Sequence, residues 1–444
     1  MKAYPKYKPS GVEWIGEIPE KWELTRMKYV APLQGGYAFK TEAFKTEGIA
    51  IVKMNNLKRG RLDLSDAVRV DFKAAVDAFS LKAGDLLFGM SGSLGETGSL
   101  GNFAVVNLVD IPCQLNQRVG RFVALQNCSL DFVRFLITSV SFTEPIMSSS
   151  TGTAQFNISS EQIGNILISL PPLPEQTAIA DFLDRKTAQI DGFIAKKQKL
   201  IELLREERVA VINHAVTKGI DPKAKMKPSG IDWLGEIPAH WEVKRLKFFA
   251  NVNPTKCNYV FDKSSNELVV FLPMENVLED GQIIQDLRKP INELSTGYTY
   301  FEKNDVIVAK ITPCFENGKG ALLDRLETPF GFGSTEFHTI RPVKAVSTNE
   351  FLYFLTKTDL FMKFGEAFMV GAAGQKRVPP NFVENFMIAS PSLDEQNHIV
   401  AFLKSETAKI DRTIATIEKE IELIQEYRTA LISEAVTGKI DVRG

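Results

Sequence analysis

Residue types that catalyse reactions occur throughout this chain, but none stands in the spacing that a familiar catalytic motif requires. Gly318-Lys319-Gly320 lacks the upstream glycine and the hydroxyl residue of a phosphate-binding loop. Gly92, Gly95 and Gly98 recur every three residues, which is not the spacing of a dinucleotide-binding turn. Pro379-Pro380-Asn381-Phe382 is a scrambled form of the Asn/Asp-Pro-Pro-aromatic tetrapeptide of amino methyltransferases. HExxH and GxSxG do not occur.

Metal ligands and acid–base pairs are not grouped in the sequence either. Glu206-Glu207 falls on a predicted long helix, where a solvated face explains adjacent carboxylates better than catalysis does. The histidines are scattered: His214, His240, His338 and His398. The cysteines have no CxxC spacing and are expected to be small buried residues in a reducing compartment: Cys113, Cys128, Cys257 and Cys314. We therefore expect no catalytic residue, metal or cofactor in this chain, and no enzyme activity of its own.

Charge and hydropathy restrict the class of protein. The 444 residues carry 53 Lys plus Arg and 54 Asp plus Glu, so the net charge is −1. This total neither favours nor excludes a nucleic-acid binder, because local patches decide such binding. With 44% hydrophobic residues, the chain can form two or three domains with cores. No apolar run is long enough for a membrane span and Met1–Ser10 does not resemble a signal peptide, so we expect a soluble cytoplasmic protein.

Two long helices must position whatever the chain binds. Glu175–Thr217 and Glu395–Thr437 both carry apolar residues at alternating steps of four and three, the heptad seam of a coiled coil. At an offset of 220, Glu175–Asp221 and Glu395–Asp441 share 24 of 47 residues. The polar interruptions of the seam are Thr187, Lys197, Arg208, Thr407 and Arg428, with Ala215 and Ala435 closing it. The apolar residues expected to pair the helices are Leu183, Ile190, Ile194, Ile201, Leu204, Val211, Leu403, Ile410, Ile414, Ile417, Ile421, Ile424 and Leu431.

Prolines and glycines mark the ends of these helices. Pro171, Pro172 and Pro174 stand just before the first, and Gly219 and Gly438 follow the ends of the two helices. A helix with such an apolar stripe needs a partner, and the other copy in the same chain is the nearest one. The alternative, two ordinary core helices, fits the strict 3.5-residue period less well.

A second duplicated motif precedes each body. Lys8–Lys28 and Lys227–Lys247 are identical at 13 of 21 positions at an offset of 219. Together with the helices, this motif defines two repeats of about 220 residues. The motif holds all four tryptophans: Trp14, Trp22, Trp233 and Trp241. They could stack on bases, but we favour a role in pinning each domain to a helix end, because both copies keep the motif while the intervening sequences diverge.

Between motif and helix, short β-rich runs alternate with short helices, so each body is predicted to be a compact α+β domain. The predicted strands are Ile49–Lys53, Asp85–Phe88, Phe103–Val106, Val119–Leu125, Val269–Leu272, Asp305–Lys310 and Phe337–Arg341. The predicted helices, with their possible caps, are Asp131–Val140 (Ser129 or Asp131) and Asn349–Thr356 (Thr348 or Asn349). Faint similarity between the bodies predicts one fold used twice with different surfaces.

The order of these motifs resembles the specificity subunit of type I restriction-modification systems over essentially the whole chain. The matching frame is SGVEWIGEIPEKWE, PPLPEQTAIADFLDRKTAQID, SGIDWLGEIPAHWE and SPSLDEQNHIVAFLKSETAKID. Lys310–Lys319 and Ser334–Phe337 are similar to common segments of the family's recognition domains. The first body departs from them at Met90–Ser93 and Asn116–Arg118, so it is expected to read a different base sequence.

The resemblance implies two α/β target-recognition domains separated by two long antiparallel coiled-coil helices, in a pseudo-two-fold internal repeat. The corresponding boundaries are 1–170 and 227–390 for the recognition domains, 171–218 and 391–444 for the helices with the C-terminal tail, and 219–226 for the linker. It implies a phage-defence protein that binds a bipartite, asymmetric target in double-stranded DNA. It also implies two adenine-methylating subunits that carry S-adenosylmethionine, and motor-nuclease restriction subunits that use ATP and Mg²⁺.

DNA bases are read by Arg, Lys, Asn, Gln and hydroxyl side chains, and phosphates are bound by Lys, Arg and backbone amides. In the first body the candidates are Lys53, Asn55, Asn56, Lys58, Arg59, Arg61, Ser91, Ser93, Gln117, Arg118 and Gln155. In the second they are Lys256, Lys310, Thr312, Lys319, Ser334, Gln375, Lys376 and Arg377. Any single one is equally well explained as a solvated surface residue. Two other functions stay open: a coiled-coil spacer that joins two protein-binding domains without touching DNA, and a nuclease or methyltransferase with a divergent site.

Overall fold

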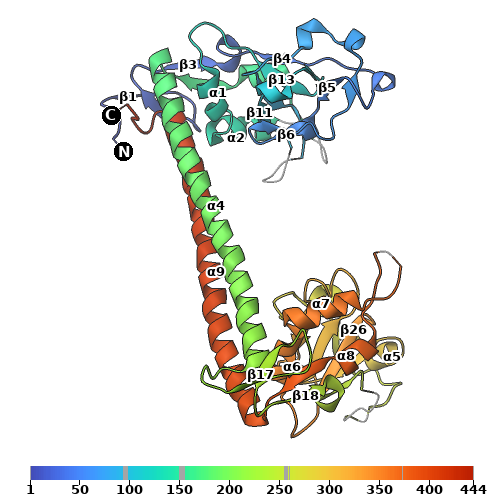
Figure 1. The fold of residues 1–444 in the computed structure, drawn as a ribbon. Helices are drawn as coiled ribbons and strands as arrows, with labels where there is room; N and C mark the ends of the chain where they lie inside the picture. Colours follow the sequence, from blue (N-terminus) through green and yellow to red (C-terminus); the bar gives the residue numbers. More distant parts are fainter. Residues whose placement is uncertain are drawn as a thin grey trace. The chain divides into compact units, whose positions relative to one another are not determined.

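The computed structural model describes residues 2–93, 99–149, 156–254, 259, 261–372 and 374–443. It consists of two compact units (Figure 1). Unit 1 contains Met1–Lys197 and Lys419–Gly444, and unit 2 contains Gln198–Glu418. Each unit therefore combines one body with parts of both long helices, which are α4 (Leu173–Lys218) and α9 (Leu393–Val436). The predicted boundaries follow the order of the chain, whereas this division by packing cuts through both helices.

The body of unit 1 is built on an antiparallel sheet, β11-β9-β13-β4, and a smaller mixed sheet, β12-β5-β8. Their strands are β4 (Leu33–Gly35), β5 (Ile49–Val52), β8 (Arg69–Val70), β9 (Leu86–Gly89), β11 (Phe103–Val105), β12 (Cys113–Leu115) and β13 (Val119–Phe122). Four two-stranded pairs complete it: β1 (Tyr7–Pro9) with β2 (Glu17–Pro19), β3 (Glu23–Arg26) with β15 (Leu167–Leu170), β6 (Leu57–Lys58) with β7 (Arg61–Leu62), and β10 (Ser91–Gly92) with β14 (Phe156–Asn157). Its short helices are α1 (Leu130–Leu136), α2 (Val140–Ser149) and α3 (Ser160–Asn165).

The body of unit 2 repeats this plan with the antiparallel sheet β19-β26-β23-β24 and the mixed sheet β21-β20-β25-β22. Their strands are β19 (Ala250–Val252), β20 (Leu268–Leu272), β21 (Arg288–Pro290), β22 (Thr299–Glu302), β23 (Val306–Ala309), β24 (Gly320–Leu322), β25 (Phe330–Gly333) and β26 (Phe337–Pro342). Two pairs complete it: β16 (Met226–Pro228) with β17 (Glu236–Pro238), and β18 (Glu242–Arg245) with β27 (Met387–Ser390). Its short helices are α5 (Ile291–Leu294), α6 (Asn349–Thr356), α7 (Asp359–Ala367) and α8 (Pro380–Asn385).

Matching strand pairs confirm that one fold occurs twice. In each mixed sheet two strands run parallel, β5 with β12 and β20 with β25, and a third strand is antiparallel to the first. The turn that precedes the central strand of each antiparallel sheet contains a left-handed residue, Gly84 (φ 90°) or Asn304 (φ 75°). Each predicted strand is present, with ends shifted by up to three residues.

The predicted helix at Asp131–Val140 requires a correction. The structure has α1 at Leu130–Leu136 and a separate helix from Val140. Ser129 caps α1 by accepting from the Phe132 amide, and Thr348 caps α6 in the same way through Phe351. The chain turns between the helices because the amide and hydroxyl of Ser139 both bond back to the carbonyl of Leu136.

The long helices run antiparallel within each unit, since partner numbers fall along α9 as they rise along α4. In unit 1, Asp191 pairs with Arg428 and Lys197 pairs with Glu420. In unit 2, Arg208 pairs with Asp411. The offset of 220 converts Arg428 into Arg208 and Asp191 into Asp411, so both units contain the same ion pair.

Each residue of the seam predicted from the heptads is buried or half-buried. In unit 1 the seam joins the body at Leu183 and Leu431, and in unit 2 it joins the body at Leu403. Other seam residues of unit 2, such as Ile201, Ile414 and Ile417, also have little exposed surface. Burial of this stripe, roughly 1.5–3 kcal/mol for each large aliphatic side chain, stabilises helices whose outer faces remain solvated.

Each body is fixed to the start of one long helix by a tryptophan and a carboxylate. The indole N–H of Trp22 donates to Glu175 at 3.1 Å, and that of Trp241 donates to Glu395 at 2.9 Å. Both indoles are buried. The prediction that the motif pins each body to a helix end is confirmed for these two tryptophans.

The end of the other long helix packs against the same indole. Gly438, after α9, lies beside Trp22, and Gly219, after α4, lies beside Trp241. Both glycines have positive φ, 74° and 75°, so a side chain at either place would strain the backbone as well as meet the neighbouring rings. Both ends of the chain belong to unit 1. Lys2 and Asp441 form an antiparallel β-bridge, and both termini lie near β1 (Figure 1).

The seam predicts a clear difference between two substitutions on α9. Ile414→Asp places a carboxylate among buried aliphatic side chains and is expected to lower the free energy of unfolding by about 3 kcal/mol. Leu423→Asp makes the same change at an exposed position and is expected to cost less than about 1 kcal/mol. Urea denaturation of the full chain measures both values. Equal losses in the two variants would contradict the seam.

The contacts of Glu395 predict a pH dependence. Burial alone would raise the pKa of Glu395, but hydrogen bonds from His240, Trp241 and Ser392 outweigh it and lower the pKa to about 2, from an ordinary value of 4.5. A carboxylate with a lowered pKa stabilises the fold above its unfolded pKa, and the contribution disappears as pH falls towards the folded pKa. Glu395→Gln should therefore be less stable than the wild type at pH 7, with a difference that shrinks between about pH 4.5 and 2.

The matched control is Glu366→Gln, an exposed glutamate on α7. It should show little difference from the wild type at any pH. Denaturation curves recorded across this pH range decide the matter, and a Glu395→Gln deficit that persists unchanged at pH 2 would count against the anchoring role of the carboxylate.

Candidate nucleic-acid interface

The two polar segments predicted for the first body meet at one edge of the mixed sheet. Strands β5 and β12 are parallel, so the residues that follow them, Lys53–Asn56 and Asn116–Arg118, leave the sheet at the same edge. The amide of Asn116 donates to the carbonyl of Val52 at 3.3 Å, which fixes the two segments side by side. The structure therefore groups side chains of the types that read bases, as Asn55, Gln117 and Arg118 are all exposed.

Tyr37 joins this edge and was not among the residues selected from the sequence. The residue is 43% exposed, and its ring packs against Phe39 and Phe79. Its amide donates to Leu115, and its carbonyl accepts from the amide of Gln117. An exposed aromatic ring beside polar side chains can stack on a base.

The approach of Tyr37 to this edge depends on Gly36. A Cβ atom at residue 36 would lie 2.2 Å from the carbonyl oxygen of Asn116, so only glycine allows the two backbones to come so close. The available signal in the sequence was the segment Gly35-Gly36-Tyr37 itself.

A basic hairpin, β6–β7, lies next along the chain. Its exposed side chains are Lys58, Arg59 and Arg61, and the turn is made by Arg59 (φ 42°) and Gly60 (φ 103°). Within the described part of the chain, these three cations form no ion pair. Lys53 lies over the ring of Phe44, with 4.2 Å between Nζ and the ring centroid. Unpaired, exposed cations of this kind suit contact with phosphates.

Two of the predicted candidates have internal partners instead. Asn56 is buried, its side-chain oxygen accepts from the Lys53 amide at 2.8 Å, and its side-chain nitrogen donates to the Asp63 carbonyl at 2.9 Å. Ser91 is buried and its hydroxyl bonds Asn157 at 2.6 Å. These polar atoms hold loops in place. Ser93 is exposed, whereas Gln155 lies outside the described residues.

The second body places its candidates at the equivalent edge, where β20 and β25 end. The amide of Ser334 donates to Leu272 at 3.0 Å, and the amide of Thr312 donates to Lys376 at 3.0 Å. Lys310, Gln375 and Lys376 are half-buried or exposed around them, while Lys256 lies outside the described residues. The structure therefore brings most of the second set together too. Lys319 differs, because its ammonium donates to the carbonyl of Met274.

Ionisable groups inside the second body have structural partners. Arg341 forms ion pairs with Glu302 and Asp305, and all three are largely buried. Burial raises the pKa of Asp305 despite this arginine. His338 donates from Nε2 to the carbonyl of Val378 at 2.8 Å, and burial lowers its pKa to about 4, so the ring is neutral at pH 7. These contacts explain the buried charges without catalysis.

Cysteines and metal ligands do not form a site in the described ranges. Burial raises the pKa of the Cys113 thiol to about 12 and that of Cys128 to about 11. Cys314 is half-buried, and Cys257 lies outside the described residues. Across the parts of the chain that are described, no group of three or more His, Cys, Asp or Glu side chains could bind a metal ion. The same residues contain no helix that is long and apolar enough to cross a membrane.

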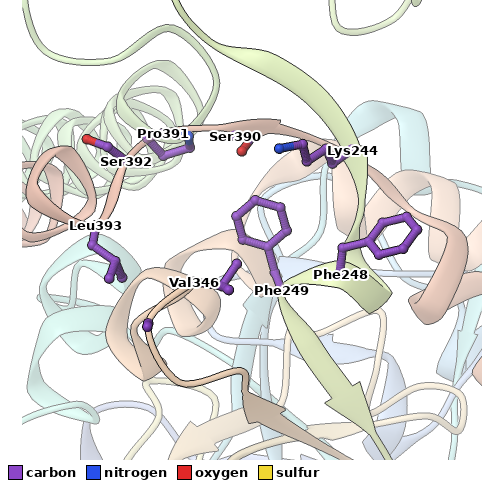
Figure 2. Close-up of a pocket in the computed structure, with 9 residues that line it drawn as sticks. Lys244, Phe248, Phe249, Val346, Ser390, Pro391, Ser392 and Leu393 are labelled. Atoms are coloured by element: carbon purple, nitrogen blue, oxygen red, sulfur yellow. The ribbon is translucent and has the colours of Figure 1, made fainter.

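A cavity of about 500 Å³ lies away from these edges, where β18, β27 and the start of α9 meet in unit 2 (Figure 2). Phe248, Phe249, Val346 and Leu393 give it an apolar lining, with Lys244 at one side. Phe248 is 59% exposed, and Tyr29, at the same position of the first repeat, is 66% exposed. Both repeats therefore expose an aromatic side chain at this position.

The fold and the two polar edges define a class of protein: a duplicated recognition protein whose repeats present different side chains on the same backbone frame. The comparisons identify its family. The chain belongs to the type I restriction modification DNA specificity domain family, whose sequence model matches residues 19–203 and 238–424.

Relatives support this assignment over different parts of the chain. The EcoAI specificity subunit of Escherichia coli is 39% identical over 168 residues, which are 37% of this chain and 28% of that protein. The chain thus spans less than a third of that relative. The StySPI specificity subunit of Salmonella potsdam is 21% identical over 442 residues, 96% of this chain and 90% of that protein.

A solved structure shows the same fold. A chain from work on complex assembly and conformational transition of the type I R-M system matches with a TM-score of 0.69 and 15% identity, over 95% of this chain and 99% of that one.

The site predicts that two neighbouring asparagines behave differently. Asn56→Ala removes two internal hydrogen bonds from a buried side chain and is expected to lower the free energy of unfolding by about 1–3 kcal/mol. Asn55→Ala, at an exposed position, should change it by less than about 0.5 kcal/mol. Denaturation of both full-length variants measures the difference, and the opposite order would show that the loop is built otherwise.

Proposed function

We propose that this chain is the non-catalytic, sequence-specific DNA-binding subunit of a type I restriction-modification complex. One observation carries the proposal: both units place polar and basic side chains at the same edge of the same fold, but the side chains differ. Two units that present different side chains to DNA suit a bipartite, asymmetric target with one half-site for each unit. Family membership supports the same function.

Within this proposal, phosphate contacts and base contacts come from different residues. Lys58, Arg59 and Arg61 contact phosphates, because they are exposed cations gathered on one hairpin. Bases are read by the side chains at the strand ends, Gln117 and Arg118 in unit 1 and Ser334 and Gln375 in unit 2, where backbone bonds fix the loops. Tyr37 stacks beside them.

The proposed partners supply the chemistry that this chain does not. Two adenine-methylating subunits with S-adenosylmethionine would modify the target, and motor-nuclease subunits with ATP and Mg²⁺ would cleave DNA in defence against phage. The exposed aromatics Tyr29 and Phe248 support two equal docking places, since they hold the same position in the two repeats. The complex would act in the cytoplasm.

The competing function is a spacer that joins two protein-binding domains and never contacts DNA. It predicts no binding to duplex DNA, whereas the proposal predicts binding that weakens steeply as salt is raised, because neutralised phosphates release counterions. Binding of the full chain, with its methylating partners, to duplex DNA at several salt concentrations separates the two functions.

The basic hairpin gives this experiment a quantitative form. Lys58→Ala combined with Arg61→Ala should weaken binding to every DNA sequence alike and reduce the slope of log affinity against log salt by about 2. Lys82→Ala changes an exposed lysine in the turn before β9 and should leave the slope unchanged. Gel-shift titrations measure the slopes, and an unaltered slope in the double variant would remove the hairpin from the phosphate interface.

A further inference from the structure

The two units place oppositely charged residues at one equivalent position. In unit 1 the amide of Met90 donates to the carbonyl of Arg118 at 3.0 Å. In unit 2 the amide of Lys310 donates to the carbonyl of Glu336 at 2.8 Å. These bonds continue the same strand pairs, β9 with β13 and β23 with β26. Arg118 and Glu336 therefore occupy the same place in the fold.

A second position beside it also differs between the units. Ser91 pairs with Asn157 in unit 1, and Ile311 pairs with Arg377 in unit 2. The amide that follows each partner returns to the same strand, from Ile158 to Met90 and from Val378 to Lys310. Asn157 and Arg377 are therefore equivalent, and each lies next to the first position.

In unit 2 the two positions form one rigid acid–base pair. Arg377 donates from Nε to Oε2 of Glu336 at 2.9 Å and from Nη2 to Oε1 at 2.8 Å. Its remaining nitrogen, Nη1, donates to the carbonyl of Gln375 at 3.1 Å. The arginine holds the pKa of Glu336 below its usual range, so the carboxylate stays ionised. Nε also donates to Oε1 at 3.1 Å, so Oε1 accepts two of these hydrogen bonds and Oε2 accepts one. Oε2 therefore retains capacity to accept a further hydrogen bond.

In unit 1 an arginine, Arg118, occupies the place of Glu336. Arg118 is exposed, and its guanidinium makes no hydrogen bond or ion pair with the residues described around it. Asn157 has no charge and bonds Ser91. A carboxylate at residue 118 would have no arginine beside it, and an unsupported anion close to DNA phosphates is unfavourable. Unit 2 thus has both the carboxylate of Glu336 and the supporting Arg377. Unit 1 has neither an acid at residue 118 nor an arginine at residue 157.

We propose that this position selects one base in each half-site: Arg118 binds a guanine and Glu336 binds a cytosine. Arginine donates in a bidentate manner to O6 and N7 of guanine, and glutamate accepts from N4 of cytosine in the major groove. Arg377 is a positioning residue that orients the carboxylate and offsets its charge near the phosphates. The inference rests on the proposed function and adds which side chains distinguish the half-sites.

The test is selection of duplexes from a randomised library by the full chain with its methylating partners. Arg118→Ala should remove the preference for guanine at one position of one half-site, by about fivefold to a hundredfold, and leave the other half-site unchanged. Glu336→Gln should remove the preference for cytosine at one position of the other half-site by a similar factor. Arg118→Ala should unfold at the temperature of the wild type, and Glu336→Gln, which loses the ion pair with Arg377, should remain folded at the temperature of the selection.

Arg377 provides the control for positioning. Arg377→Ala should lower the preference for cytosine at the position that Glu336→Gln affects, whereas Arg377→Lys should restore part of it. Selection unchanged in the Arg118 and Glu336 variants would overturn the inference, and so would an equal loss of affinity for all sequences, which marks phosphate contacts. A wild-type chain that selects no bipartite sequence would instead overturn the proposed function.

Discussion

The antiparallel contact between α4 and α9 is the interaction on which the rest of the structure depends. In unit 1 the body packs against the first turns of α4 and the last turns of α9, and in unit 2 these roles are exchanged. Neither body is therefore completed by its own repeat alone. The cores contain helix residues such as Leu183 with Leu431, and Ile212 with Leu403. Loss of the seam would expose an apolar face of each body as well as of each helix.

This dependence explains which parts of the repeat remain alike. The Trp–Glu pairs, the Gln side chains at the helix starts and the Arg–Asp pairs between helices all occur twice, because each forms part of a junction. Gln176 and Gln396, for example, each bond the backbone at the cap of α1 or α6. The strand ends do not take part in a junction. They can carry Asn-Gln-Arg in one unit and Ser-Thr-Glu in the other while the frame stays the same.

The sequence was informative where structure follows from local periodicity. The heptads of α4 and α9, the caps Ser129 and Thr348 and the strands of both bodies could be predicted, since each depends on residues close together in the chain. Residues whose role depends on distant partners could not. Asn56 and Ser91 look like base readers in sequence but bond Asp63 and Asn157 inside the fold. Tyr37 joins the polar edge only because Gly36 allows the approach to Asn116. The pairing of Glu336 with Arg377 joins residues 41 positions apart.

The central proposal is that one chain directs methylation to two different half-sites. Mapping of methylated adenines in the genome of the host, with and without this chain, tests it most directly. We predict that the chain is required for methylation of one asymmetric sequence in two parts, separated by an unread spacer. Methylation that is unchanged when the chain is absent, or that follows a continuous sequence, would contradict the account.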